Sequence, residues 1–215
     1  MRFCFCILLL CLLFLQPVMA QPEAYLGWFT DADIVNSSKL AAPAGAPKLV
    51  SGGTAGKCID LPLKPIGLSL PTVGLEKYGI ISFWIRPKWD GKVENGGSAH
   101  KILRMGDPGE NGLLIEVNNA KGLLRFVMAG KNGSEKKITA SRTDVSNWKA
   151  GDWHHVMVGW LEKDGSPSGL VIWIDRIPVV STVFGGTQYM DPSSMSDNKL
   201  YLGDPSSGAY MDELI

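Results

Sequence analysis

The segment 153–161, rich in β-branched and aromatic residues whose side chains alternate between two faces, predicts a β-strand. Side chains two positions apart share a face of a strand, so Val156, Val158 and Trp160 are expected on one buried face. The turn-forming segment 163–169 follows, and then comes a β-branched and aromatic run at 170–174. Turn formers between two such runs indicate a chain reversal. The pattern therefore predicts two antiparallel strands, and a third after the next tight turn.

Similar short runs, bounded by Gly, Pro, Asn and Asp, recur along most of the chain. They lie at 25–29, 57–61, 80–86, 101–105, 113–117, 123–129, 136–140, 179–183, 200–203 and 210–215. No stretch after the first twenty residues keeps a helical period long enough to predict a helix. Many short strands at close spacing favour an all-β fold, an antiparallel β-sandwich of jelly-roll type.

The first twenty residues differ in composition from the rest of the chain. Arg2 precedes an apolar run at 6–15, and Pro17 and Ala20 follow it, which is typical of a signal peptide. A lipid anchor at Cys11 is the competing interpretation. The pattern predicts a signal peptide at 1–20, a single domain at 21–215, and a secreted, extracellular or cell-surface location, with the periplasm as an alternative.

Removing the signal peptide leaves Cys58 as the only cysteine, which excludes an intramolecular disulfide. The full chain carries 21 Lys and Arg residues against 21 Asp and Glu residues, without a basic block. This balance does not favour nucleic acid or an anionic membrane as a partner. No membrane insertion is expected after signal removal.

Residues with the chemistry of catalysis are present, but not in catalytic arrangements. Retaining glycosidases need two carboxylates roughly 5 Å apart. Glu116 stands alone on its strand, and the adjacent Asp212 and Glu213 point to opposite faces. The neighbours His154 and His155 also face opposite ways, so they cannot share a metal. We expect no catalytic site; a glycoside hydrolase, or an accessory domain of one, is the alternative.

Loop aromatics and amides supply candidate ligand contacts. Trp89 and Tyr189 lie beside predicted loops, where an aromatic ring can stack on a sugar or a protein partner. Asn118 and Asn119 add amides that suit a carbohydrate. The same loop aromatics could instead cover the edge of the core. Five other tryptophans are expected to be structural. We expect Trp84, Trp160 and Trp173 in the core, with Trp148 and Trp153 at one end of the sandwich.

Four stretches resemble a known superfamily, in its usual order. They are Gly53 to Asp60, Ile80 to Pro87, Trp153 to Trp160 with Ile172 to Asp175, and Leu200 to Gly203 with Met211 to Ile215. Together they resemble the laminin-G-like branch of the concanavalin A-like lectin/glucanase superfamily, with pentraxins as relatives. The resemblance implies a concanavalin A-like jelly roll. Because the chain stops within the family's closing strand, we expect it to be truncated at the C-terminus.

This sequence departs from its relatives at two positions of the hairpin. Arg176 stands where many relatives have glycine, and Met157 stands where pentraxins place a disulfide cysteine. The resemblance also implies calcium as a cofactor. Its ligands would be Asp31 or Asp33 together with Asp212; alternatively, the first two solvate a turn and Asp212 caps a strand bend.

The sequence thus predicts a secreted, non-catalytic recognition module with calcium as a candidate stabilising ion. Its expected partner is a glycan or an extracellular protein, bound at loops or on a concave sheet face. A structural domain of a larger surface protein is a third interpretation, besides the glycoside hydrolase. Fold does not fix function, so the choice among the three depends on the site.

Overall fold

The computed structural model describes residues 48–54, 56–69, 79–109, 111–132, 135–163, 166–183, 199–212 and 214. The predicted signal peptide at 1–20 and the predicted strand at 25–29 lie outside these residues. Within the described part of the chain, no helix is long and apolar enough to cross a membrane.

The described residues form thirteen strands and no α-helix. Their bounds are β1 Lys48–Gly53, β2 Gly56–Asp60, β3 Ile66–Ser69, β4 Gly79–Pro87, β5 Ala99–Asp107, β6 Asn111–Asn118, β7 Leu123–Asn132, β8 Glu135–Asp144, β9 His154–Lys163, β10 Ser166–Ile174, β11 Ile177–Val183, β12 Lys199–Leu202 and β13 Ala209–Asp212. The strands predicted from residue 57 onward are all present, and β1 and β3 are additional.

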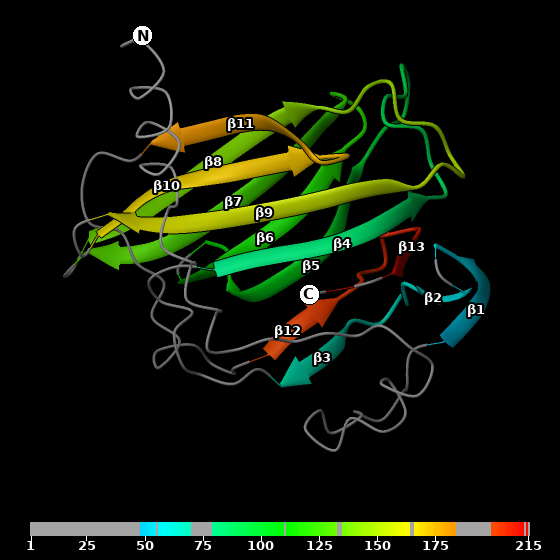
Figure 1. Ribbon diagram of the computed structural model, residues 1–215, viewed down its shortest axis with the longest axis horizontal. Helices are drawn as coiled ribbons and strands as arrows, with labels where there is room; N and C mark the ends of the chain where they lie inside the picture. Colours follow the sequence, from blue (N-terminus) through cyan, green and yellow to red (C-terminus); the bar gives the residue numbers. More distant parts are fainter. Residues whose placement is uncertain are drawn as a thin grey trace, which may run out of the picture.

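The strands form two sheets that lie one behind the other (Figure 1). The seven-stranded sheet has the order β1-β2-β13-β4-β9-β10-β11, and the six-stranded sheet has the order β3-β12-β5-β6-β7-β8. Neighbouring strands in both sheets are antiparallel. The fold is therefore an antiparallel β-sandwich of jelly-roll type, which confirms the predicted fold class.

The space between the sheets is filled by one apolar core. From β9 come Val156, Val158 and Trp160, all at or below 1% exposure, as the alternation predicted. The six-stranded sheet contributes Phe126, whose ring lies 6.3 Å from that of Trp160. Contact between these two large side chains helps hold the two sheets together.

Strands β10 and β11 are joined by a two-residue turn. Its residues, Asp175 and Arg176, have φ angles of 51° and 70°, the left-handed conformation that a type I′ hairpin turn requires. Glycine is favoured at the second of these positions, so the arginine there is unusual. The Asp175 carboxylate accepts hydrogen bonds from the His155 backbone N (2.8 Å) and from His154 Nδ1 (3.1 Å). These bonds tie the turn to the start of β9.

Strand β13 occupies an interior place in the seven-stranded sheet, although it is the last of the described strands in sequence. Tyr210 pairs with Asp60 of β2 on one side and with Arg86 of β4 on the other. The C-terminal part of the described chain therefore joins the first two strands to the rest of their sheet.

Candidate functional site

The predicted ligand residue Trp89 lies at an end of the sandwich where several loops meet. Its Nε1 donates a hydrogen bond to the backbone oxygen of Ser207 (2.8 Å). Its ring stacks on His100, with centroids 4.4 Å apart and planes 14° apart. At least one face of the Trp89 ring is thus occupied within the protein.

The two predicted amides, Asn118 and Asn119, hold the turn between β6 and β7. Asn118 Oδ1 accepts a hydrogen bond from the backbone N of Lys121 (3.2 Å). Asn119 is buried, and its Oδ1 accepts one from the backbone N of Ser98 (2.7 Å). Tyr189, the fourth predicted ligand residue, lies outside the described residues. Ligand contact at these positions stays a prediction.

The predicted metal ligand Asp212 is half-buried at the end of β13. Its Oδ2 accepts hydrogen bonds from the backbone N and from Oγ1 of Thr54, both at 2.7 Å. The other predicted ligands, Asp31 and Asp33, lie outside the described residues. Residues that the structure describes contain no group of three or more His, Cys, Asp or Glu side chains placed to hold a metal. A calcium ion at Asp212 would therefore need ligands from the rest of the chain.

The groups with catalytic chemistry have structural partners. Glu116 is buried, and its Oε1 accepts a hydrogen bond from Arg125 at 2.6 Å. The buried thiol of Cys58 lies 3.8 Å from the backbone oxygen of Val50. Burial raises the pKa of this thiol, which keeps it protonated and a weak nucleophile. His154 stacks on buried Trp148 with ring centroids 4.2 Å apart. Each of these groups has a partner within the fold.

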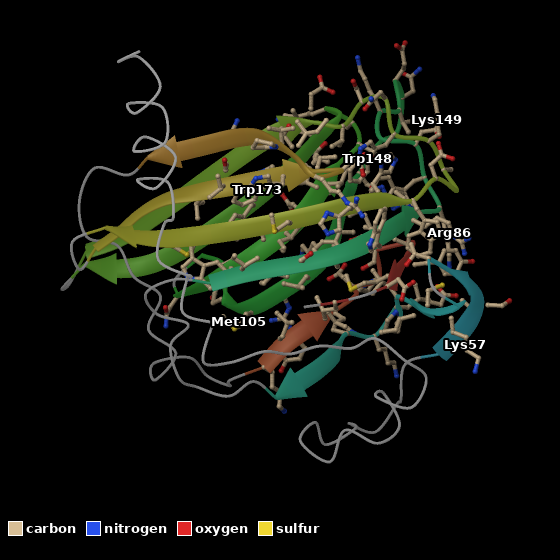
Figure 2. All side chains as sticks on the ribbon, viewed as in Figure 1. Lys57, Arg86, Met105, Trp148, Lys149 and Trp173 are labelled. Atoms are coloured by element: carbon tan, nitrogen blue, oxygen red, sulfur yellow. The ribbon has the colours of Figure 1, made fainter. Side chains whose placement is uncertain are left out.

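The outer face of the seven-stranded sheet carries aromatic side chains that the sequence analysis assigned to the core. Trp160 is buried as expected, but the prediction was wrong for Trp84 and Trp173, which are only half-buried. Both point away from the core, on β4 and β10; Figure 2 labels Trp173 on β10. We define the tryptophan face by the outward residues Ile80, Ser82, Trp84, His155, Met157 and Trp173.

Strand register places these side chains in adjacent rows. Met157 of β9 lies between Ser82 of β4 and Trp173 of β10. In the next row, Trp84 lies opposite His155. Neighbours in such rows have Cβ atoms about 4.5–5.5 Å apart, so the side chains form a continuous surface.

A glycine widens the tryptophan face beside Trp173. A Cβ at Gly159 would lie 3.6 Å from both Trp173 Cζ3 and Ile80 Cγ1. The Trp173 ring therefore lies next to the Gly159 backbone, with Ile80 beside it. Ile80 is 58% exposed, which is high for an isoleucine on a strand. The result is an apolar platform made of a ring edge and an aliphatic side chain.

Polar groups border this platform. The Ser82 Oγ and His155 Nε2 atoms are 2.9 Å apart and share a hydrogen bond. The Trp84 and His155 rings are in tilted contact, with centroids 5.2 Å apart. The hydroxyl and the imidazole are thus held in place between the two tryptophans.

A cluster of cations and aromatic rings lies in the next row of the same sheet. The Arg86 guanidinium is 4.5 Å from the centroid of the Tyr210 ring and 5.0 Å from that of Trp153. Lys88 lies 4.3 Å from the Tyr210 ring and forms an ion pair with Asp60 at 2.6 Å. Burial lowers the pKa of Lys88, but the hydrogen bond and charge of Asp60 outweigh it and raise that pKa above its ordinary value.

The protein is thus a jelly-roll β-sandwich whose seven-stranded sheet carries aromatic side chains on its outer face. No protein-family profile matches this chain, and no curated protein sequence matches it. Solved structures do match in fold.

Two of the similar structures are toxin binding domains. The binding domain of Paraclostridial Mosquitocidal Protein 1 has a TM-score of 0.58 and 18% identity, with 81% of this chain and 42% of that chain covered. The binding domain of botulinum neurotoxin serotype D has a TM-score of 0.57 and 12% identity, with 78% and 40% covered. This chain thus spans about two fifths of these structures.

A third similar structure is an enzyme. The endo-beta-1,4-glucuronan lyase from the fungus Trichoderma reesei has a TM-score of 0.55 and 12% identity, with 90% of this chain and 94% of that chain covered. At such identities the three likenesses establish the β-sandwich fold alone.

Proposed function

We propose that this protein is a secreted, non-catalytic recognition module that binds carbohydrate on the tryptophan face. The observation that carries the proposal is the outward position of Trp84 and Trp173. Sugar rings present C–H faces that pack on aromatic rings, and their hydroxyls need nearby polar partners. Ser82 and His155 lie between the two rings and share a hydrogen bond with each other. Export of the chain is inferred from residues 1–20.

The comparisons support a binding role without deciding the ligand. Two of the similar structures are described as binding domains, although this chain spans only part of each. The lyase raises the enzyme alternative, with a polysaccharide as substrate. Glu116 pairs with Arg125 rather than with a second carboxylate. This pairing argues against a retaining glycoside hydrolase, which needs two carboxylates. We therefore favour binding without catalysis.

We also propose that the domain is laminin-G-like and that it binds calcium. The four matching stretches lie on β2, β4, β9, β10, β12 and β13. Asp212 is the calcium ligand that the resemblance implies, and its Oδ2 accepts two hydrogen bonds from Thr54. In this proposal Asp31 or Asp33 supplies further oxygens, which calcium needs in number.

Glycan binding is expected to depend on Trp173. The variant Trp173→Ala should weaken binding of any glycan found on an array by about tenfold or more, since aromatic anchors contribute most of such energies. Titration calorimetry on residues 21–215 would measure the loss. Trp89→Phe, at the loop end, should bind like the wild type. Loss of binding in the Trp89 variant alone would place the site at the loops, and the absence of any bound glycan would favour a structural domain.

Calcium is expected to stabilise the fold through Asp212. An ion at about one hundred times its Kd should raise Tm by about 5–10 °C in a domain of this size. Thermal melting with calcium and with EDTA would measure the shift, and Asp212→Asn should abolish it. Asp144→Asn is a matched control, because Asp144 Oδ1 accepts bonds from both the backbone N and Oγ of Ser146. An unchanged Tm in EDTA would refute the calcium proposal.

A further inference from the structure

The outer face of the six-stranded sheet carries a row of charged side chains. Register places Lys101 of β5 opposite Glu116 of β6, Glu116 opposite Arg125 of β7, and Arg125 opposite Arg142 of β8. Neighbouring strands are about 4.8 Å apart, so the row spans roughly 14 Å across the sheet. We call these four residues the cationic row.

The positive charges of the row are accessible, whereas its single carboxylate is covered. Lys101 and Arg142 are exposed, and the Arg125 side chain is 36% exposed against 7% for Glu116. Arg125 donates one hydrogen bond to Glu116 Oε1 at 2.6 Å. Its buried Nε has no hydrogen-bond partner in the described part of the chain. Because that Nε is buried, only the exposed part of the Arg125 side chain is open to a ligand.

Two arginines lie directly opposite each other in this row. Like charges in such cross-strand positions destabilise a sheet, and Glu116 flanks Arg125 on the other side only. An anion that bridges Arg125 and Arg142 would remove this repulsion. The pair therefore has an electrostatic reason to bind an anionic group.

A further cation extends the positive surface along the sheet. Arg104 of β5 lies 4.2 Å from the centroid of the Tyr201 ring of β12. The nearby Asp204 is an opposing charge. Burial raises the pKa of Asp204, but hydrogen bonds from Ser206 and the charges of Lys101 and Arg104 hold that pKa below its ordinary value. Asp144 lies two residues from Arg142 on the same face of β8, so these residues comprise four cations and three carboxylates, an excess of one positive charge.

We propose that the cationic row binds a polysaccharide that carries carboxylates, such as a uronic acid polymer. The planar guanidinium matches a carboxylate in a forked geometry, and Arg125 already binds one carboxylate in the row, that of Glu116, through a single hydrogen bond. The row lies on a sheet face. An extended acidic peptide would instead add to a strand edge, where backbone groups are available.

This binding surface is independent of the tryptophan face. The two surfaces belong to different sheets, which lie on opposite sides of the core (Figure 1). Trp173→Ala should therefore leave binding at the cationic row unchanged. Loss of glycan binding at the tryptophan face and loss of binding at the cationic row can therefore be measured separately.

Titration calorimetry with polygalacturonate at low salt tests the proposal on residues 21–215. We expect binding that weakens with added salt, and little binding of the fully methyl-esterified polymer, which lacks the charges. Arg142→Gln should raise Kd about fivefold, the effect of losing one exposed charge contact. Arg176→Gln is the matched control, since it removes one exposed arginine from the β10–β11 turn, and its Kd should equal that of the wild type.

Three results would overturn the proposal. One is the absence of polygalacturonate binding at low salt. Another is an equal loss of affinity in the Arg142 and Arg176 variants, which would indicate unspecific attraction. The third is equal or tighter binding of dextran sulfate or single-stranded DNA, which would show that the row does not select carboxylates or a uronate chain.

Discussion

Trp160→Ala is expected to lower the free energy of unfolding by about 3–5 kcal/mol, the cost of replacing a large buried aromatic residue by alanine. The Trp160 ring is 1% exposed and contacts Phe126 of the opposite sheet. Its removal leaves a cavity that the rigid strands on either side can fill only in part. Chemical denaturation of the purified domain would measure the change.

Trp173→Ala is the matched control for this prediction. It removes the same side chain from the neighbouring strand, but from the outer, half-buried face. The free energy of unfolding should fall by about 1 kcal/mol or less, in line with its smaller buried area. If the two variants lost equal stability, the assignment of Trp160 to the core and of Trp173 to the outer face would be incorrect.

Gly91→Ala is expected to lower the free energy of unfolding by up to about 3 kcal/mol. A Cβ at Gly91 would lie 1.8 Å from the backbone oxygen of Val145 and 2.9 Å from the Trp148 Cβ. The Gly91 backbone N also donates a hydrogen bond to the Trp148 oxygen at 2.9 Å. Because the clash is with backbone, the loop after β4 must separate from the segment after β8. Thermal melting would detect this loss.

Gly159→Ala provides the comparison for Gly91→Ala. A Cβ at Gly159 meets no atom closer than 3.4 Å, an ordinary van der Waals contact. Alanine is also favoured over glycine in a strand by about 0.5–1 kcal/mol. The Gly159 variant should therefore be at least as stable as the wild type. A similar loss in both variants would contradict the close approach at Gly91.

The sequence predicted the faces of β9 correctly, yet it failed for two tryptophans. Alternation assigned Val158 and Trp160 to the core, where the structure has them. The same rule, applied to β10, places Trp173 outward, because Ile172 and Ile174 on either side of it are buried. The sequence analysis did not apply alternation to Trp173 and instead assigned this tryptophan to the core. The signal for the tryptophan face was therefore present in the sequence.

The cationic row could not be predicted in the same way, because it depends on strand register. The predicted strand 136–140 ends before Arg142, whereas β8 continues to Asp144. A strand that ends at residue 140 leaves Arg142 in the predicted loop. Its pairing with Arg125 is fixed by the hydrogen bonds between β7 and β8 along their whole length. Register of this kind follows from turn geometry and sheet packing, which no local pattern records.

The two strands that the sequence analysis missed are short or rich in glycine. β1 ends in Gly52 and Gly53, and β3 has only four residues. Both are edge strands that acquire their conformation from a single neighbour, β2 or β12. Their local sequence contributes little to that choice, so tertiary pairing decides it.

The interior place of β13 has a consequence for how the protein forms during synthesis. Until residues 209–212 leave the ribosome, β2 and β4 cannot be joined, and each keeps an unpaired edge. Domains of this topology close contacts between segments far apart in sequence, which slows folding. The nascent chain thus passes through a stage with open strand edges, when pairing with a second chain competes with completion of the sheet.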